Sequence, residues 1–462
     1  MILAIDIGTT VLKAALVSKE GRIEAIAKRQ LSIDSEMCTD ALAWIDAIAS
    51  ASNEIASQAG KDAAKAIVVD ANGPTLIAYP DTRARLWLDR SASIDSIKAS
   101  EAAGFGLDSS FMIPKILKLR RTEPETFLRT KWFFGAQDYV NYILTGVSAT
   151  LMPLEGLEKW YWNDAMLDRL SLARPLFPAF IRMGSIIGSL RPEMAQRMGL
   201  GSSVPVIAGC PDFASSIIGS GTMKSGMICD RSGTSEGINL CSGTPSSDPH
   251  LMCYRHPDGK DWNISGIIST TGKAISKTMS LLGFKDDDYE GFYELARHSS
   301  AGSGGVIFQP YLAGERAPIW DSSARASFFG MTASTGRCDI ARSACEGICL
   351  AIADVLDAMK APRNQMRITG GPSENSFLNQ LKADVCQIPI TAIDSPEPEL
   401  LGLAIIGYTG LGVFPTLSEG AEALVKTGRT YEPRRTLAGL YHDALETYRK
   451  LYRVQQKSSP AT

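Results

Sequence analysis

The sequence predicts an α/β protein, and three observations lead to this fold class. Short apolar runs of strand length alternate with amphipathic helical stretches along most of the 462 residues. One helix, over residues 340–360, shows a clear apolar stripe and stops ahead of a proline. Two Gly-Thr turns, in "DIGTT" and "DRSGTSE", each lie between strand-like runs half a chain apart. This weak internal repeat predicts two related lobes that each open on a β-hairpin.

The individual elements follow from the positions of these patterns. The first hairpin is predicted from the runs 2–7 and 11–17. Further strands are expected at 66–70, 204–207, 227–230 and 305–309, and further helices at 41–57, 114–120 and 138–144. Glycine, serine and threonine gather in "GSGTMKSG" around Gly221. We therefore expect one lobe over residues 1–220 and a second over residues 221–462.

Composition limits the class of protein and its compartment. The chain has 47 basic and 50 acidic residues, a net charge of −3, so no basic surplus points to nucleic acid. No apolar run reaches the ~20 residues that a membrane helix needs. The nine cysteines are scattered and form no C-x-x-C pair. We expect reduced thiols, no membrane partner and a cytoplasmic protein.

The first turn combines groups that suit a phosphate chain. Gly8 lets backbone N–H groups approach a ligand, and Thr9 and Thr10 add hydroxyl donors. Lys13 can place its ammonium on the same side, and Asp6 can anchor Mg²⁺ through water. The alternative is an ordinary turn with a solvent-exposed aspartate and lysine. The second Gly-Thr turn disfavours that alternative, because Gly233 and Thr234 would form the other half of a phosphate clamp.

Asp212 is the candidate general base. It follows the apolar run "VPVIAGC" and precedes a helix start, "FASSI", which places it at the carboxyl end of a strand. Ligands of α/β folds usually bind at that edge, and a carboxylate there can accept a proton from a hydroxyl. The alternative role is a helix N-cap.

Five segments, taken in order, carry a resemblance to a known family. They are "DIGTTVLKA", "AGCPDF", "DRSGTSE", "YLAGERAPIWDSSARASFFG" and "ITGGPSENSFLNQLKADV". Together they resemble the FGGY carbohydrate kinases from residue 2 to about residue 412. The resemblance implies two ribonuclease-H-like lobes of the actin/hexokinase type, with ATP and a sugar in the cleft between them.

The resemblance also implies a role for each matching residue. Asp212 is the catalytic base, and Asp6 with Asp212 would hold the metal, Mg²⁺. The remaining residues bind the ATP phosphates (Thr9, Thr10, Lys13, Gly233, Thr234), the adenosine (Gly272, Gly370, Gly371, Asn375) or the sugar (Asn72, Asp212).

The sugar-binding stretch departs from the better-known subfamilies. The stretch "DANG" stands where xylulose kinases usually have Q-M-H-G, with Asp70 at the glutamine and Asn72 at the histidine. Glycerol kinases carry an Arg-Glu pair where this chain has Asn72-Gly73. Residues 150–164 carry charges where many members have small and hydroxylated residues: Glu155, Glu158 and Lys159. A ketopentose such as xylulose, or a related sugar or polyol, is the substrate we expect.

Two other functions stay open at this point. A sensing protein could keep the kinase fold with little turnover, and an actin-like ATPase could form filaments. The segments "AGCPDF" and "SENSFLNQLKADV" favour the kinase over the filament. The expected partner is a small-molecule sugar, and a homodimer is compatible with the sequence.

Overall fold

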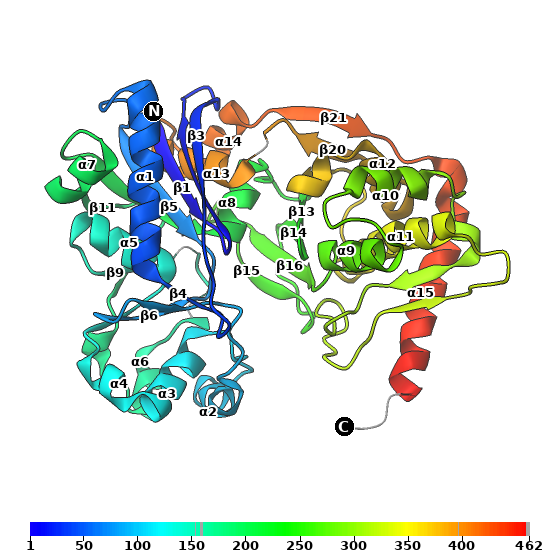
Figure 1. Ribbon diagram of the computed structural model, residues 1–462, viewed down its shortest axis with the longest axis horizontal. Helices are drawn as coiled ribbons and strands as arrows, with labels where there is room; N and C mark the ends of the chain where they lie inside the picture. The colour runs from blue at the N-terminus through cyan, green and yellow to red at the C-terminus, as the bar shows by residue number, and fades with distance from the viewer. Residues whose placement is uncertain (153, 158–159, 396, 459–462) are drawn as a thin grey trace. The chain divides into compact units, whose positions relative to one another are not determined.

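The computed structural model describes residues 1–152, 154–157, 160–395 and 397–458 (Figure 1). The chain forms two compact units, each with its own mixed β-sheet. Unit 1 comprises Met1–Gly221, Pro257–Gly259 and Glu397–Val425, and unit 2 comprises Thr222–His256, Lys260–Pro396 and Lys426–Thr462. The predicted α/β class is confirmed.

Unit 1 is built on a six-stranded sheet. Its order is β11 (Ile186–Ser189), β12 (Pro205–Pro211), β5 (Ala66–Ala71), β1 (Ile2–Ile7), β2 (Val11–Val17) and β3 (Ile23–Gln30). Strands β1, β2 and β3 are antiparallel, whereas β5 and β12 run parallel to β1. The carboxyl ends of β1, β5 and β12 therefore meet at one edge. The first hairpin begins and ends where the sequence predicts.

The helices of unit 1 come from two distant parts of the chain. They are α1 (Ala41–Ala59), α5 (Ala136–Thr145), α7 (Pro192–Met198), α8 (Asp212–Gly219), α13 (Pro398–Gly410) and α14 (Leu417–Leu424). Helix α13 packs on α8 and on β1, although the expected division at residue 221 placed it in the second lobe. Two glycines allow this contact: a Cβ at Gly219 would lie 1.8 Å from the Pro398 oxygen, and one at Gly402 would lie 2.0 Å from the Ser215 oxygen. Only glycine lets two helix backbones approach so closely.

A smaller layer completes unit 1. Its four strands are antiparallel, in the order β4 (Cys38–Asp40), β7 (Arg83–Arg85), β6 (Leu76–Tyr79) and β8 (Trp132–Phe134). Four helices accompany them: α2 (Ser93–Ala103), α3 (Met112–Thr122), α4 (Pro124–Arg129) and α6 (Asp164–Leu170). The parallel pair β9 (Ala149–Met152) and β10 (Ala179–Arg182) forms a separate two-stranded sheet. An apolar cluster that includes Phe133 and Trp162 fills the space under this layer.

Unit 2 repeats the plan of the main sheet of unit 1. Its seven strands run β15 (Met252–Arg255), β16 (Trp262–Ile268), β14 (Glu236–Ser242), β13 (Ile228–Ser232), β19 (Met366–Thr369), β20 (Ile390–Ile393) and β21 (Thr427–Tyr431). The hairpin β13–β14 pairs with β16 through β14 and with the parallel strand β19 through β13, and β20 pairs with β19. Both predicted Gly-Thr hairpins are thus real, and each starts the main sheet of its unit.

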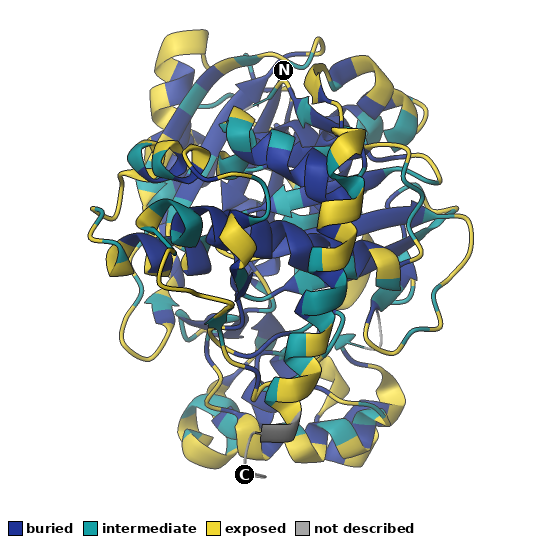
Figure 2. Cartoon of the chain, turned by 90° about the vertical axis from the view of Figure 1, so that its right-hand side faces the viewer, coloured by how far each residue is buried: buried dark blue, intermediate teal, exposed yellow. Residues whose placement is uncertain are grey.

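The helices of unit 2 are α9 (Gly272–Leu281), α10 (Tyr289–Arg297), α11 (Arg337–Ala358), α12 (Ser376–Cys386) and α15 (Ala438–Ser458), with the short pair β17 (Ile307–Gln309) and β18 (Ser327–Phe329). Helix α11 is the one predicted over 340–360, displaced by two or three residues at its ends. Strands in both units are mostly buried, whereas exposure concentrates on loops and outward helix faces (Figure 2). Among the described residues, no helix is both long and apolar enough to cross a membrane.

Candidate active site

The first Gly-Thr turn of unit 1 is held from two sides. The Gly8 N–H donates to the Val11 carbonyl at 3.1 Å, and a Cβ at Gly8 would lie 2.6 Å from that oxygen. Asn72, after β5, donates from Nδ2 to the carbonyls of Ile7 (3.0 Å) and Gly8 (3.2 Å). Trp87 Nε1 donates to Thr9 Oγ1 at 3.1 Å. The turn that the sequence assigns to phosphate binding is therefore fixed before any ligand arrives.

Asn72 is the residue that the sequence assigns to the sugar. Its side chain is 3% exposed, and its Oδ1 accepts a hydrogen bond from Thr75 Oγ1 at 3.1 Å. The contacts of Asn72 in the structure hold the first Gly-Thr turn, and the contact with a sugar stays a prediction. Two other residues of the unusual sugar segment, Glu158 and Lys159, lie outside the described residues.

Carboxylates gather at the edge where β1 and β5 end. Asp6 and Asp70 are partners in the parallel register of these strands, with 6% and 0% exposure. Lys13, on β2, lies 3.6 Å from Asp6 Oδ2 and 2.7 Å from Glu397 Oε2. Glu399, in the first turn of α13, accepts a hydrogen bond from Ser216 at 2.5 Å. Sequence reasoning found Asp6 and Lys13 but missed Glu397 and Glu399, because they come almost 400 residues later and no spacing links them.

Burial and mutual repulsion change the acidity of this cluster. Burial raises the pKa of Asp6 to about 7, Glu399 adds to the rise, and the Lys13 ammonium opposes it. Burial also raises the pKa of Asp70 well above its ordinary value, and the neighbouring Asp6 raises it further. Burial alone would lower the pKa of Lys13, but Asp6 and Glu397 raise it above its ordinary value. Lys28 also pairs with Glu397, at 2.5 Å. The carboxylates of the cluster still outnumber Lys13 and Lys28, so the cluster favours a bound proton or cation.

Asp212 is the first residue of α8, directly after β12. Its Oδ1 accepts a hydrogen bond from the Phe213 N–H at 2.7 Å. The N-cap of α8 is Pro211, so the alternative role of Asp212 as a helix N-cap is wrong. Ser215 Oγ donates to the Asp212 carbonyl at 2.8 Å and to the Asp70 carboxylate. Ser215 therefore connects the end of β5 to the first turn of α8.

Unit 2 contains a cavity of about 630 Å³ beside the second Gly-Thr turn. Gly233 and Thr234 line it together with Gly272, the first residue of α9. The Gly272 N–H donates to the Gly233 carbonyl at 3.1 Å, and a Cβ at Gly272 would lie 2.4 Å from that oxygen. The start of α9 thus packs directly on the turn, because the N–H groups of Gly272 and Lys273 donate to the carbonyls of Gly233 and Thr234, and all four residues line the cavity.

The predicted adenosine segment borders the same cavity. Gly371 and Asn375 line it, and Asn375 caps α12 by accepting hydrogen bonds from the N–H groups of Phe377 (3.0 Å) and Leu378 (3.1 Å). Gly370 has φ +89°, and a Cβ there would lie 1.9 Å from the Ser232 oxygen. Gly370 therefore lets the adenosine segment pack on the end of β13.

Lys382 lies at the base of this cavity in an ionic cluster that sequence reasoning missed. It is 3% exposed, and its Nζ contacts Asp230 Oδ2 (2.5 Å), Ser232 Oγ (2.6 Å) and Glu236. Burial and the adjacent Glu236 raise the pKa of Asp230, whereas Lys382 lowers the pKa of Glu236 despite its burial. The cluster joins both strands of the second hairpin to α12. A lysine among the apolar residues of "FLNQLKADV" is the signal that could have found it.

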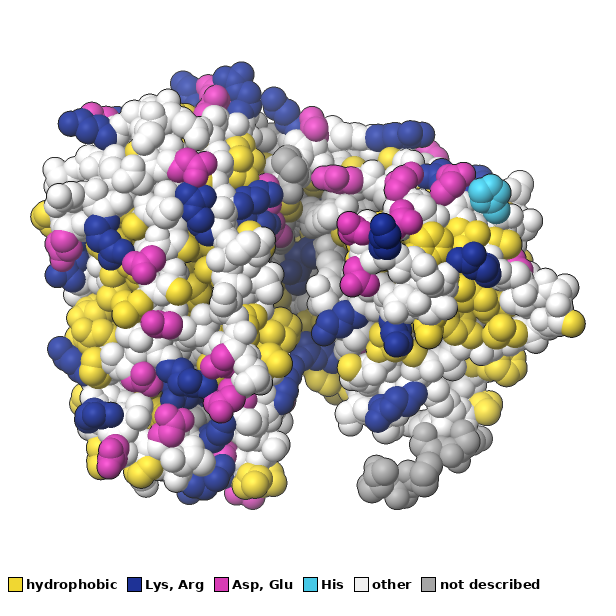
Figure 3. Space-filling view, in the orientation of Figure 1, with side chains coloured by type: hydrophobic (Ala, Val, Ile, Leu, Met, Phe, Trp, Pro, Cys, Tyr) yellow, Lys and Arg dark blue, Asp and Glu magenta, His cyan; other side chains and the backbone are white. Residues whose placement is uncertain are grey.

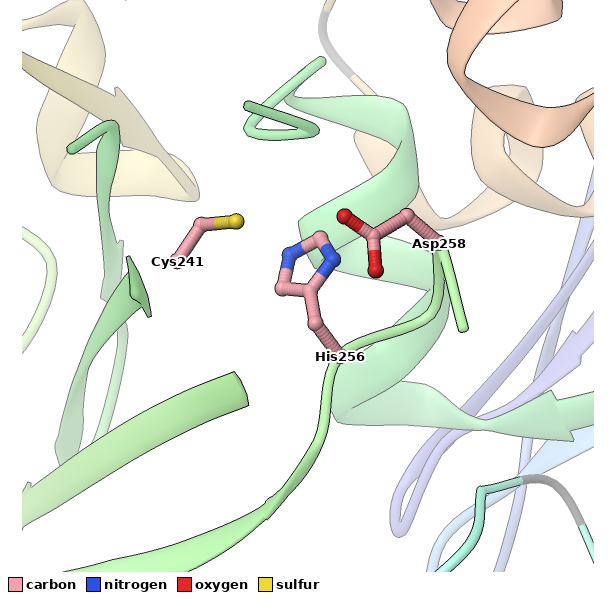
Figure 4. A group of neighbouring side chains, drawn as sticks. All are labelled: Cys241, His256 and Asp258. Atoms are coloured by element: carbon pink, nitrogen blue, oxygen red, sulfur yellow. The ribbon is translucent and has the colours of Figure 1, made fainter. Parts of the chain in front are cut away.

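Two buried side chains of unit 2 have the chemistry of soft metal ligands. Figure 4 shows Cys241, on β14, and His256, after β15, with Asp258 two residues further along the chain. Cys241 donates to Asp261 Oδ2 at 3.6 Å. A structural zinc site takes four ligands, and Cys241 and His256 of unit 2 supply two.

Comparison with known proteins places this geometry in a family. The pattern of the FGGY family of carbohydrate kinases matches with its N-terminal domain over residues 1–219 and with its C-terminal domain over residues 231–411. The chain belongs to the FGGY family of carbohydrate kinases. The resemblance drawn from the five sequence segments is confirmed. Members of this family are phosphotransferases, and they use ATP.

Relatives of more than one specificity are similar to this chain. A xylulose kinase of Staphylococcus epidermidis is 27% identical, with 98% of this chain and 96% of that one covered. A gluconokinase of Bacillus subtilis is 26% identical, with 84% and 78% covered. Among solved structures, a ligand-bound xylulose kinase from Lactobacillus acidophilus has a TM-score of 0.89 at 25% identity, covering 99% of this chain and 98% of that one. A gluconate kinase from the same organism has a TM-score of 0.90 at 24% identity with the same coverage, which shows the fold alone.

Proposed function

We propose that this kinase transfers the γ-phosphoryl group of ATP to a hydroxyl of a ketopentose such as xylulose, or of a related sugar or polyol. The observation that supports this most is the position of Asp212. It stands at the carboxyl end of β12, in the first turn of α8, and its charge acts on the buried carboxylates Asp6 and Asp70. A general base next to a preformed phosphate turn is the arrangement that phosphoryl transfer to an alcohol requires.

Each unit has its own part in the proposed reaction. In unit 1, Asp212 accepts the proton of the attacking hydroxyl, and the hydrogen bond from the Phe213 N–H orients its carboxylate. The sugar oxygen forms a bond to the γ-phosphorus while the bond to the bridging oxygen of ADP breaks. Thr9, Thr10 and Lys13 stabilise the charge on the phosphoryl oxygens. In unit 2, Gly233, Thr234 and the adenosine segment hold the nucleotide in the 630 Å³ cavity.

The residues present also fit Mg²⁺, which would neutralise phosphate charge when bound. Asp6 and Asp212 would hold it, since carboxylate oxygens are ligands that Mg²⁺ prefers. The excess negative charge around Asp6 supports this assignment.

A sugar acid such as gluconate is the second candidate substrate. It is favoured by the gluconokinase relatives, whose identity to this chain is close to that of the xylulose kinases. A carboxylate on the substrate would need a cationic partner that a ketopentose does not, so a direct comparison of the two substrates separates these candidates.

The decisive experiment measures ADP release with Mg²⁺-ATP over ketopentoses, ketohexoses, polyols and gluconate. Asp212→Asn, which keeps the size of the side chain and removes the base, is the matched control. We expect one strong substrate, with turnover reduced by about 10²–10⁴-fold in the variant. Equal turnover of Asp212→Asn would refute the general-base assignment. Silence over the whole panel with intact ATP binding would instead favour the sensing protein.

A further inference from the structure

Unit 2 has a second cavity, and it is lined by four arginines. Its volume is about 340 Å³, and the lining comes from α10, α11, α12, β21 and the loop after β21: Arg297, Arg342, Ser376, Phe377, Gln380, Arg429, Tyr431 and Arg434. No acidic residue is part of this lining. On the face shown in Figure 3, positive and negative side chains are interspersed.

This arginine pocket is distinct from the 630 Å³ cavity beside Gly233 and Thr234, which we call the nucleotide cavity, although residues of helix α12 line both. Leu378 and Lys382, one helical turn apart, line the nucleotide cavity. Ser376 and Gln380, also one turn apart, line the arginine pocket. The two pairs are offset by two residues, about 200° around a helix, so they lie on opposite sides of α12. A ligand in one pocket does not occupy the other.

The positive charge of the arginine pocket is only partly neutralised. Arg342 Nε contacts Glu346 Oε1 at 2.7 Å, and Arg434 Nη2 contacts Asp384 Oδ2 at 2.5 Å. These two arginines hold the walls of the pocket. Arg297 and Arg429 are freer to take a ligand.

Two guanidinium groups of the arginine pocket are held less tightly than those of Arg342 and Arg434: Arg297, in a longer ion pair with Glu294, and Arg429. Arg297 Nε lies 3.4 Å from Glu294 Oε2, on the same helix. Arg429 is exposed and forms no ion pair with any described carboxylate, and its guanidinium lies 4.8 Å from the Tyr431 ring centroid. Arg297 itself lies 5.1 Å from the centroid of Phe377, which supports one face of its guanidinium.

We propose that the arginine pocket binds a small phosphorylated molecule, recognised through a phosphate monoester dianion. Guanidinium groups present planar forks of N–H donors that match phosphate oxygens, and they lose little hydration energy on binding. A volume of about 340 Å³ fits a pentose phosphate and is at the small end for ligand pockets. The ligand could be the product of the proposed reaction or another phosphorylated metabolite, since both present the same group. Binding to this pocket does not depend on the proposed function.

The test is calorimetric titration with ribose 5-phosphate, with ribose as the uncharged control. Saturating ADP fills the nucleotide cavity, and the salt concentration is fixed at 0.15 M so that screening is constant. We expect ribose 5-phosphate to bind and ribose not to bind. The phosphorylated product of the kinase reaction, titrated in a separate arm, distinguishes the two sources of the ligand: binding tighter than that of ribose 5-phosphate indicates the product, and weaker binding indicates another phosphorylated metabolite.

Variants of the two available arginines locate the site. Arg297→Gln and Arg429→Gln should each weaken binding of ribose 5-phosphate by about ten- to a hundredfold, the value of a charged hydrogen bond. Arg435→Gln is the matched control, because Arg435 is exposed and close in sequence but is not part of the lining. The proposal is overturned if wild-type protein binds no phosphate monoester, or if all three variants lose the same affinity.

Discussion

Replacing Lys382 by methionine should destabilise unit 2 through the charge that it leaves behind. The variant keeps the length of the side chain but removes the ammonium that contacts Asp230, Ser232 and Glu236. Glu236 is 2% exposed, so its carboxylate cannot recover hydration. Breaking a buried ion pair in this way costs about 3–5 kcal/mol.

Glu236 can avoid this cost by taking up a proton. With an ordinary pKa of 4.5, protonation at pH 7 costs about 3.4 kcal/mol, and at pH 5 it costs about 0.7 kcal/mol. The variant should therefore lose about 3 kcal/mol of unfolding free energy at pH 7 and less than about 1 kcal/mol at pH 5. In the variant, burial without the Lys382 ammonium raises the pKa of Glu236 in the folded state. The loss of unfolding free energy therefore grows as the pH rises.

Urea unfolding at the two pH values measures this difference, and hydrogen exchange in β13 and β14 assigns it to unit 2. Lys285→Met, at an exposed position of the same unit, controls for the loss of a lysine. The double variant Lys382→Met/Glu236→Gln should recover most of the loss at pH 7. A loss of the same size at pH 5 and pH 7 would refute the electrostatic explanation and indicate lost packing instead.

Gly272→Ala places a methyl group 2.4 Å from the Gly233 oxygen. We expect the KM for ATP to rise about tenfold or more, measured by steady-state kinetics, and the fold to be retained, measured by thermal unfolding. Burial lowers the pKa of Lys115 from 10.5 to about 7. Between these two values the unfolded chain binds a proton that the folded chain does not, so the unfolding free energy should rise with pH. Relative to Lys115→Met, we expect a rise of up to about 1.4 kcal/mol per pH unit between pH 7 and 10. If the unfolding free energies of the wild type and Lys115→Met depended on pH in the same way, the three carbonyl oxygens that accept hydrogen bonds from Lys115 would offset the effect of burial on its pKa. Removal of Mg²⁺ with EDTA should abolish turnover, and added Mg²⁺ should restore it. The melting temperature should stay within a few degrees of its value with Mg²⁺. Turnover that persists in EDTA would contradict the metal assignment.

Short sequence patterns predicted the helices and strands that depend mainly on residues close together in the chain. The hairpin β1–β2 has the predicted ends because two apolar runs flank a turn with glycine, and α11 follows from one continuous apolar stripe. Backbone geometry demands glycine at Gly8 and Gly272, where a Cβ would lie 2.6 Å and 2.4 Å from a carbonyl oxygen, whereas a Cβ at Gly233 would meet only an ordinary contact at 3.5 Å. The sugar contact of Asn72 remains a prediction, since its observed hydrogen bonds hold the first turn.

The sequence by itself determined the α/β class, the two hairpins, the family and the candidate base Asp212, because each rests on short motifs whose own residues are close together in the chain. Only the tertiary structure decided which charges share a site. Glu397 reaches Lys13 because α13 returns to unit 1 through contacts that glycine permits, and Lys382 reaches Asp230 because α12 packs on the second hairpin. Burial then sets the protonation of these groups, and burial is a property of the packed chain that no short segment of sequence contains.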